Sequence, residues 1–596
     1  MYGHLQAESR EQLTSAAAIA TGSADVCRTR GALLNSAKWF PLARAKKLIS
    51  RYFALRLLAL IERCRRRILT VDALHHVRIS EFMFVDARQL PQDMEVDADI
   101  CIIGAGAAGI TMARALSGGK RKIAVFESGG FEFDVDTQKL YAGDVIGYSY
   151  TPIDRDRLRF LGGSTNHWQG SCRPFDAFDL EEWPIGLDVL EPYYRQAQQI
   201  CQLGPYSYDP QDWIDAEARP ISASSSDSLK STLFQYSPPT RFGTVYRDEL
   251  EAAGNLTVYL HANLVAINTN EAASSVTGVE IACLTGKRFR ARARHYVLAT
   301  GGIENVRLLL NCTRVQKSGL GNGNDLVGRY FMDHVYVPKA ATVLADVSSP
   351  EVRFYDHHLV RGQPIEGIFT ASDELRRARQ MPPFYIGFRV PTTEIAELGV
   401  ERLPASIRGL LGEGVAHSIE YYYSRTTSSM QVPAKWLYEK MWRTPPGTFV
   451  TCYSSGPYPD PDSRVTLSDT VDALGLRQTR LDWRLPADFV QDMHRAHEQL
   501  AQLLGRSGVG RLRIESSETG YDPMQDVVNA HHHMGTTRMH DDPRQGVVDR
   551  DCRIHGIGNL FVAGSSVFPS YACDDPTMTV VALALRLADH LKSLAS

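Results

Sequence analysis

The sequence predicts an α/β fold built around a buried parallel sheet, and three separate segments of the chain predict it. Residues 99–103 (Asp-Ile-Cys-Ile-Ile) form an apolar run without polar alternation, as expected of a parallel strand that is buried on both faces. Residues 296–299 and 560–563 are two further apolar runs, and a glycine follows each of the three runs directly or after one residue. At 596 residues, the chain is long enough for several domains or one large composite domain.

The first apolar run begins a complete βαβ unit. It is followed by a G-x-G-x-x-G turn, a helix expected over 110–116 and a second strand expected over 122–126. The first glycine allows the tight turn, the second lets the backbone approach a pyrophosphate, and the third lets helix and strand pack closely. An acidic residue at the end of the second strand can accept hydrogen bonds from a ribose. The residues that predict this dinucleotide site are Gly104, Gly106, Gly109 and Glu127.

A further strand, separate from the βαβ unit, runs into a second glycine turn at residues 296–302. A helix is expected after it over 303–310. Such a second junction, at Gly301, is typical of FAD-binding proteins and unusual in NAD dehydrogenases. We therefore expect the dinucleotide to be FAD.

The C-terminal region contains the histidine-rich run Asn529-Ala-His531-His532-His533-Met534-Gly535. A histidine is the natural general base for removing a proton from an alcohol. If the run is a strand, alternate residues share a face, so His531 and His533 could bind a metal ion together. No acidic residue or cysteine stands at metal-ligand spacing, so we predict no metal site. Solvated histidines without a role are the third alternative.

These motifs together resemble the GMC (glucose–methanol–choline) flavoprotein oxidoreductases, in particular bacterial dehydrogenases and their pyranose-oxidase-like relatives. The resemblance extends from about Asp97 to the C-terminus. It is carried by six segments: DADICIIGAGAAGI (97–110), LRFLGGSTNHWQGSCRPF (158–175), VGRYFMDH (327–334), HHHMGTTRM (531–539), NLFVAGSSVFP (559–569) and DPTMTVVALALRLADHL (575–591).

The resemblance implies that a base removes a hydroxyl proton while hydride passes from carbon to flavin N5. In the family the base is the histidine two residues before the Met-Gly pair, which is His532 here, with His533 the adjacent alternative. The cofactor-binding residues that it implies, together with those found above, are Gly104, Gly106, Gly109, Glu127, Gly163, Asn166, His167, Gly301, Gly564 and Ser565.

The sequence departs from the family at Asp575, where Asn or His usually precedes the Pro-Thr of the closing segment. Three interpretations stay open. Asp575 could be protonated by burial and donate a hydrogen bond, it could form an ion pair with His532 or with a cationic substrate, or the protein could have lost ordinary alcohol oxidation.

His167 stands four residues after the paired glycines, at the position where some family members attach FAD covalently. The resemblance therefore implies FAD as the cofactor, with a covalent bond through His167 as one alternative. A hydrogen-bonded loop histidine is the other.

The resemblance also implies the domain organisation. We expect a discontinuous, Rossmann-like FAD-binding domain over 96–190, 240–345 and 525–596, and a substrate-binding domain with a mostly antiparallel sheet over 191–239 and 346–524. Residues 1–95 have no counterpart in the family core and are predicted to be a basic helical extension.

That extension is strongly basic, with thirteen Lys and Arg residues against two acidic residues between Val26 and Arg78. Apolar residues at helical spacing interleave with the basic ones, which predicts an amphipathic helix. The helix could pack on the acidic body of its own chain, or dock on an anionic membrane or an electron-accepting partner protein. Nucleic acid is not expected, because no platform of aromatic and basic residues accompanies the charge.

The ten cysteines are scattered without a C-x-x-C pair, which suits a reducing compartment. We therefore predict a cytoplasmic protein, with peripheral membrane attachment as an option. Its predicted function is FAD-dependent oxidation of a hydroxyl group on a small polar or natural-product substrate, as a dehydrogenase rather than an oxidase. Two alternatives stay open: a redox-silent flavin enzyme such as a lyase or decarboxylase, and a non-catalytic FAD-binding assembly protein.

Overall fold

The computed structural model describes residues 83–221, 228–346, 349–378, 381–389, 448–456, 458–514, 523–525 and 527–594. All of them fall within one compact unit, 82–596. The basic helix expected between residues 26 and 78 lies outside the described residues.

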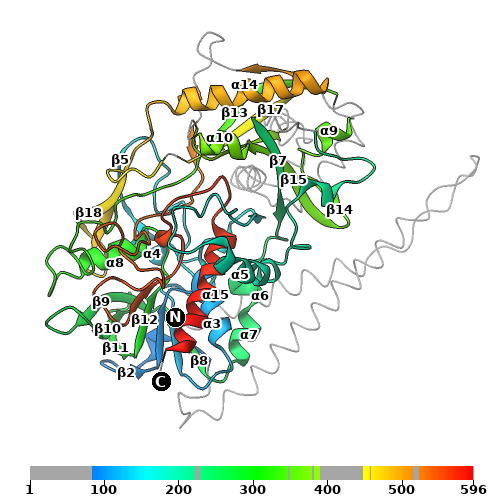
Figure 1. The fold of residues 1–596 in the computed structure, drawn as a ribbon. Helices are drawn as coiled ribbons and strands as arrows, with labels where there is room; N and C mark the ends of the chain where they lie inside the picture. The colour runs from blue at the N-terminus through cyan, green and yellow to red at the C-terminus, as the bar shows by residue number, and fades with distance from the viewer. Residues whose placement is uncertain are drawn as a thin grey trace, which may run out of the picture. The chain divides into compact units, whose positions relative to one another are not determined.

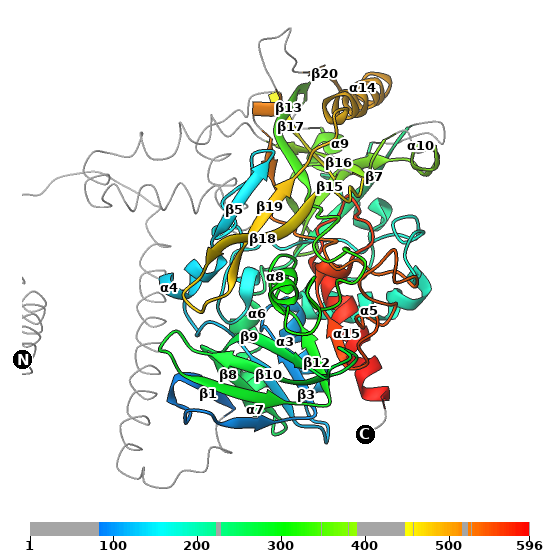
Figure 2. The same ribbon diagram turned by 90° about the vertical axis from the view of Figure 1, so that its left-hand side faces the viewer.

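A six-stranded parallel sheet forms the lower half of the unit as it is drawn in Figures 1 and 2. Its strand order is β1 (Phe84–Asp86), β8 (Leu256–Leu260), β4 (Ile123–Phe126), β3 (Ile100–Ile103), β12 (His295–Leu298) and β22 (Leu560–Val562). The three apolar runs singled out in the sequence are thus three neighbouring strands, β3, β12 and β22.

These strands form because both of their faces are covered. Every residue of β3 and β4 is buried, which explains the absence of polar alternation. The helices α3 (Ala107–Leu116) and α15 (Thr577–Ser593) pack against each other, and α15 also packs against α5 (Leu187–Ile200), as Figure 1 shows. Eleven of the seventeen residues of α15 are buried, so this C-terminal helix is part of the core.

A second, larger sheet is antiparallel and lies above the parallel sheet in Figure 2. Its path is β20 (Gly510–Ile514), β13 (Val335–Ala345), β17 (Thr448–Ser455), β16 (Phe384–Arg389), β15 (Gln363–Ala371), β7 (Leu229–Tyr236) and β6 (Ser171–Cys172). Two short strands join it, β14 (His358–Val360) beside β15 and β21 (Val528–Asn529) beside β13. Helix α14 (Phe489–Ser507) packs against β20.

Two smaller sheets contain the other described strands. The first has four strands in the order β2 (Glu95–Asp97), β11 (Arg288–Arg292), β10 (Val276–Ala282) and β9 (Asn263–Thr269). The second has three strands in the order β18 (Arg464–Val471), β19 (Arg477–Trp483) and β5 (Gly143–Gly147). The remaining α-helices of the described ranges are α4 (Val135–Gln138), α6 (Phe242–Val245), α7 (Arg247–Ala252), α8 (Glu304–Asn311), α9 (Pro350–Arg353) and α10 (Asp373–Arg377). Over the described ranges, no helix is both long and apolar enough to cross a bilayer.

The α/β class with a parallel and an antiparallel sheet is confirmed. Three strands of the antiparallel sheet, β6, β13 and β21, lie within ranges assigned to the FAD-binding domain. The division of the chain into an FAD-binding domain and a substrate-binding domain stays a prediction. Strand β13 of the antiparallel sheet begins immediately after His334.

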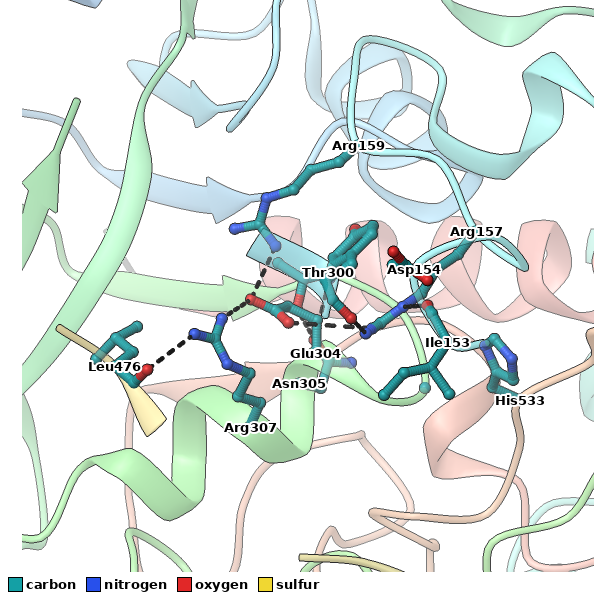
Figure 3. Close-up of polar contacts among 12 residues, drawn as sticks. Ile153, Asp154, Arg157, Arg159, Thr300, Glu304, Asn305, Arg307, Leu476 and His533 are labelled. Atoms are coloured by element: carbon teal, nitrogen blue, oxygen red, sulfur yellow. Dashed lines mark hydrogen bonds and ion pairs between the residues drawn. The ribbon is translucent and has the colours of Figure 1, made fainter. Parts of the chain in front are cut away.

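A buried ionic network fastens the loop 153–160 to helix α8 (Figure 3). The Glu304 carboxylate lies 3.0 Å from Arg159 Nη1, 2.9 Å from Arg307 Nη1 and 4.0 Å from Arg157 Nη1. The side chains of these four residues are at most 7% exposed. Arg307 also pairs with Asp472 in the turn between β18 and β19. Because buried charges are costly unless they are paired, the network holds these three segments in a fixed arrangement.

We predict that Glu304→Gln destabilises the protein by about 3–5 kcal/mol, because it leaves buried arginines without their shared counter-charge. Glu249→Gln is a matched control, since Glu249 pairs with Arg114 while 48% of its side chain is exposed. The control should cost less than about 1 kcal/mol. Thermal unfolding of both holoprotein variants, followed by circular dichroism, measures the difference. Equal unfolding midpoints for the two variants would contradict the structural role of Glu304.

Candidate active site

Three glycine turns meet at one edge of the parallel sheet. Gly104 follows β3, Gly301 follows the end of β12, and Gly564 follows the end of β22. Since β3, β12 and β22 are adjacent and parallel, their carboxyl ends lie side by side. Ligands of open α/β sheets bind at this edge. The pairing of strands therefore brings together Gly104, Gly301 and Gly564, which stand far apart in the sequence.

The first of these turns has the two properties that a dinucleotide site requires. A methyl group on Gly109 would lie 1.9 Å from the carbonyl oxygen of Gly104, so only glycine allows helix α3 to start this close to β3. A methyl group on Gly106 would meet no atom within 4 Å among the residues that the structure describes. Helix α3 begins directly after Gly106 and directs its first N–H groups into this open space, as a pyrophosphate requires.

Glu127 lies at the end of β4 and holds the turn from the side. Its carboxylate accepts hydrogen bonds from the backbone N–H groups of Ala105 and Gly129, both at 2.9 Å. A carboxylate oxygen can accept more than one hydrogen bond, so a ribose hydroxyl could also bind there.

The loop that carries Gly163, Asn166 and His167 packs directly on the first glycine turn. The N–H of Gly162 donates to the carbonyl of Ala105 at 2.8 Å, and a methyl group on Gly163 would come within 3.1 Å of Gly106 Cα. Asn166 donates to the carbonyls of Leu161 and Gly163, so its amide closes the loop on itself. His167 follows this turn and is partly buried. The covalent link through His167 stays a prediction.

These features fit FAD. Two further glycines at the same sheet edge, Gly301 and Gly564, also face space that is empty of the described atoms within 4 Å. The turns can therefore hold a long ligand against backbone atoms, while the assignment of Gly104, Gly106 and Glu127 to the ADP part stays a prediction.

The histidine-rich segment lies against the second and third of these turns. A methyl group on Gly302 would lie 2.4 Å from the carbonyl oxygen of His533, and the Ser565 hydroxyl donates to the same carbonyl at 2.6 Å. The adjacent His532 is partly exposed, with 23% of its side chain accessible. Its Nδ1 lies 2.9 Å from His334 Nδ1 and 3.6 Å from Asp575 Oδ1.

The three neighbouring histidines have different surroundings. His533 Nε2 lies 2.9 Å from a carboxylate oxygen of buried Asp156, and His531 Nδ1 lies 2.9 Å from the amide of Asn529. The expectation that this run could be a strand is wrong: β21 ends at Asn529, and His531 has φ +64°. His531 and His533 are therefore not on one strand face, and among the three it is His532 that lies beside Asp575.

Burial controls the charge of this centre. Burial, followed by the charge that His533 can carry, lowers the pKa of His532 to about 3. Burial likewise raises the pKa of Asp575 to about 6. At neutral pH His532 is thus an uncharged imidazole and Asp575 is mostly a carboxylate.

The two consecutive aspartates at the start of α15 have separate partners. Asp574 is fully buried and accepts a hydrogen bond from Arg173 Nη1 at 2.5 Å. Asp575 accepts a hydrogen bond from the Ser171 hydroxyl and faces His532. The buried arginine therefore neutralises Asp574 and leaves Asp575 as the carboxylate next to the imidazole.

Sequence reasoning assigned no role to His334 or Ser171. Both lie within segments that matched the family, VGRYFMDH and LRFLGGSTNHWQGSCRPF, but neither segment stands near His532 in the sequence. The one sequence signal for either residue was that a histidine and a serine stand inside segments that match the family. Their contacts with His532 and Asp575 depend on where β13 and β6 begin.

Comparison with known proteins identifies the class. Residues 99–315 match the family model of FAD-dependent oxidoreductases, and residues 459–584 match the model of GMC oxidoreductases. The chain therefore contains a domain that matches GMC oxidoreductases and a domain that matches FAD-dependent oxidoreductases.

Individual relatives are distant but span most of the chain. The 2-methyl-1,2-propanediol dehydrogenase of Mycolicibacterium austroafricanum is 23% identical over 83% of this chain and 95% of its own length. The fructose dehydrogenase large subunit of Gluconobacter japonicus is 23% identical over 75% of this chain and 83% of its own length. Among solved structures, pyridoxine 4-oxidase from Mesorbium loti shares the fold, with a TM-score of 0.52 at 16% identity, covering 84% of this chain and 100% of that one.

We predict that Gly106→Ala folds but loses most of its FAD, because the added methyl group fills the space left for the pyrophosphate. Gly254→Ala is the control: its methyl group also meets no described atom within 4 Å, and Gly254 lies in the turn between α7 and β8. The flavin-to-protein absorbance ratio and the unfolding midpoint of the FAD-free form measure the two effects. A Gly106→Ala protein that retains full flavin would show that the pyrophosphate binds elsewhere.

Proposed function

We propose that this enzyme oxidises a hydroxyl group of a small polar substrate and that His532 accepts the hydroxyl proton. The single observation that carries the proposal is the position of His532: a partly exposed imidazole in the segment that packs against the glycine turns at the sheet edge. Bound FAD supplies the two-electron oxidant for such a reaction.

The neutral state of His532 suits a proton acceptor. An alcohol is a weak acid, so removal of its proton must coincide with its oxidation, and the acceptor must hold a lone pair throughout the working pH range. Burial keeps the pKa of His532 near 3, so the imidazole has that lone pair at every pH above this value. The cost of charging a buried imidazole must then be offset in the transition state.

Asp575 is placed to offset that cost. Its carboxylate lies 3.6 Å from His532 Nδ1, and the Ser171 hydroxyl binds its other oxygen. A carboxylate at this distance stabilises the imidazolium that forms when His532 takes up a proton. This geometry supports the ion-pair interpretation of Asp575 over a hydrogen-bond donor and over loss of alcohol oxidation.

The proposal extends to the electron acceptor and the place of action. We infer a dehydrogenase that passes its electrons to an acceptor other than oxygen, and a cytoplasmic location with the basic residues between 26 and 78 as the docking segment. The name of one relative, a dehydrogenase large subunit, supports a partner protein. Slow reoxidation of the reduced enzyme in air would support the same inference.

The test of the function is anaerobic bleaching of the flavin by hydroxyl compounds. Because two relatives are named for them, 2-methyl-1,2-propanediol and fructose are the first compounds to try, followed by a wider set of polyols and sugars. We predict that His532→Ala lowers the bleaching rate by about 10²- to 10⁴-fold. His531→Asn is the control, since asparagine tolerates the positive φ of this residue, and its rate should stay within a few-fold of the wild type.

Rapid bleaching by His532→Ala would rule out His532 as the base. A wild-type flavin that no hydroxyl compound bleaches, in a protein that binds FAD, would instead favour a redox-silent enzyme or an assembly protein.

We predict a pH dependence that belongs to Asp575. Since burial raises its pKa to about 6, Asp575 gains a proton as the pH falls through 6 and no longer stabilises the imidazolium. The bleaching rate should therefore rise between pH 5 and 7.5 with an apparent pKa near 6. Asp575→Asn should lower the rate at pH 8 by about tenfold, roughly 1.4 kcal/mol, and lose this rise.

Comparing the pH profiles of the wild type and Asp575→Asn distinguishes the titration of Asp575 from that of two other carboxyl groups. These are Asp333 and Asp574, whose pKa values burial also raises to about 6. Both are unchanged in Asp575→Asn. A variant that keeps the rise near pH 6 would assign it to one of them.

A further inference from the structure

The segment VGRYFMDH (327–334) ends in Asp333 and His334, two fully buried residues that the proposed reaction does not use. We propose that His334 is a positioning residue that fixes the tautomer of His532, so that the lone pair of His532 is on Nε2. The proposal rests on the proposed function in one respect, the choice of His532 as the base.

The backbone around His532 is held by the same segment, 327–334. The two carboxylate oxygens of Asp333 accept the N–H groups of His532 at 2.8 Å and of His531 at 3.2 Å. Tyr150 donates its hydroxyl to the same carboxylate at 2.5 Å. On either side, the N–H of Ala530 donates to the carbonyl of His334 at 3.0 Å, and Met332 and Met534 exchange a pair of backbone hydrogen bonds. The main chain of the histidine-rich segment is therefore fixed before its side chains are considered.

The side chain of His334 has its hydrogen assigned by its surroundings. Its Nε2 lies 2.7 Å from the carbonyl oxygen of Ala572, and a carbonyl oxygen can only accept, so Nε2 must carry the hydrogen. Burial, followed by the neighbouring His532, lowers the pKa of His334 to about 4, so the ring is neutral at pH 7. A neutral imidazole has one N–H, which leaves the Nδ1 atom of His334 as an acceptor.

The position of the hydrogen on His334 also determines the position of the hydrogen on His532. Its Nδ1 lies 2.9 Å from the Nδ1 acceptor of His334 and must therefore donate a hydrogen. His532 is also neutral, so its remaining nitrogen, Nε2, holds the lone pair. The opposite tautomer would place two lone pairs 2.9 Å apart in a buried site, which is unfavourable. The chain of contacts from Ala572 through His334 thus selects Nε2 as the proton-accepting atom.

The arrangement also suits the protonated state. When His532 accepts a proton on Nε2, its Nδ1–H bond to His334 is unchanged, and Asp575 lies 3.6 Å from that nitrogen. No ring has to rotate and no second proton has to move. His334 therefore acts on the rate of proton transfer through His532, without contact with the substrate being required.

The test compares His334→Asn with His334→Leu in the holoenzyme. The two side chains have similar size, but only asparagine can place an oxygen acceptor near the position of His334 Nδ1. The first readout is the tautomer of His532, seen in long-range ¹H–¹⁵N spectra of protein labelled in the histidine rings and assigned by comparison with His532→Asn. We expect the hydrogen on Nδ1 in the wild type and in His334→Asn, and a mixture of tautomers in His334→Leu.

The second readout is anaerobic flavin bleaching by the best compound of the panel. We expect His334→Leu to lower the limiting rate by on the order of 10²-fold with little change in the half-saturating concentration, and His334→Asn to recover part of that loss. A purely structural role would instead lower flavin content in both variants. If His334→Leu does not fold, the wild-type spectrum and His334→Asn still decide the tautomer.

Three results would overturn the proposal: a hydrogen on Nε2 of His532 in the wild type, a His334→Leu spectrum identical to the wild type, or one equivalent of a divalent metal ion in the purified protein. The last matters because the donor atoms of His334, His532 and Asp575 lie within 4.8 Å of one another and could instead share a metal ion. The spectrum does not depend on the reaction. A fixed tautomer without bleaching would therefore refute the proposed function alone.

Discussion

The parallel pairing of β3, β12 and β22 is the constraint on which the rest of the site depends. These strands come from residues 100–103, 295–298 and 560–562, so the pairing joins segments up to 460 residues apart. Their shared direction places three glycine turns at one edge, where backbone atoms can approach a long planar ligand. The histidine-rich segment packs against two of those turns through Gly302 and Ser565, so the position of His532, the proposed base, follows from the same pairing.

Burial then decides the chemistry of the side chains at this edge. Neutral imidazoles at His532 and His334 result from the cost of placing positive charge in a buried site, and the raised pKa of Asp575 results from the same cost for negative charge. A site of this kind holds a proton acceptor and a counter-charge ready before substrate binds. In the proposed arrangement, the hydrogen bonds from Ala572 through His334 to His532 leave Nε2 of His532 as the nitrogen that accepts a proton.

Ionisable groups near His532 and Asp575 that take no part in the proposed proton transfer have other partners. Arg173 neutralises Asp574, the neighbour of Asp575, and Asp156 binds His533, the neighbour of His532. The network of Glu304 with Arg159 and Arg307 fastens the loop that leads into the Gly162–Gly163 turn (Figure 3). Because Arg173 binds Asp574 and Asp156 binds His533, their neighbours Asp575 and His532 face each other.

The sequence by itself determined the class of fold, the glycine turns and the resemblance to GMC oxidoreductases, because these depend on local patterns: apolar runs of strand length, glycines at fixed spacing, and a histidine at a fixed distance from a Met-Gly pair. It could not separate His532 from His533 on physical grounds, since adjacent residues differ only in which way the folded chain turns them. It also left Asp575 with three interpretations and His334 with none. The arguments for these residues needed the tertiary structure, because burial and a neighbour 198 residues away affect the charge and the hydrogen position of an imidazole.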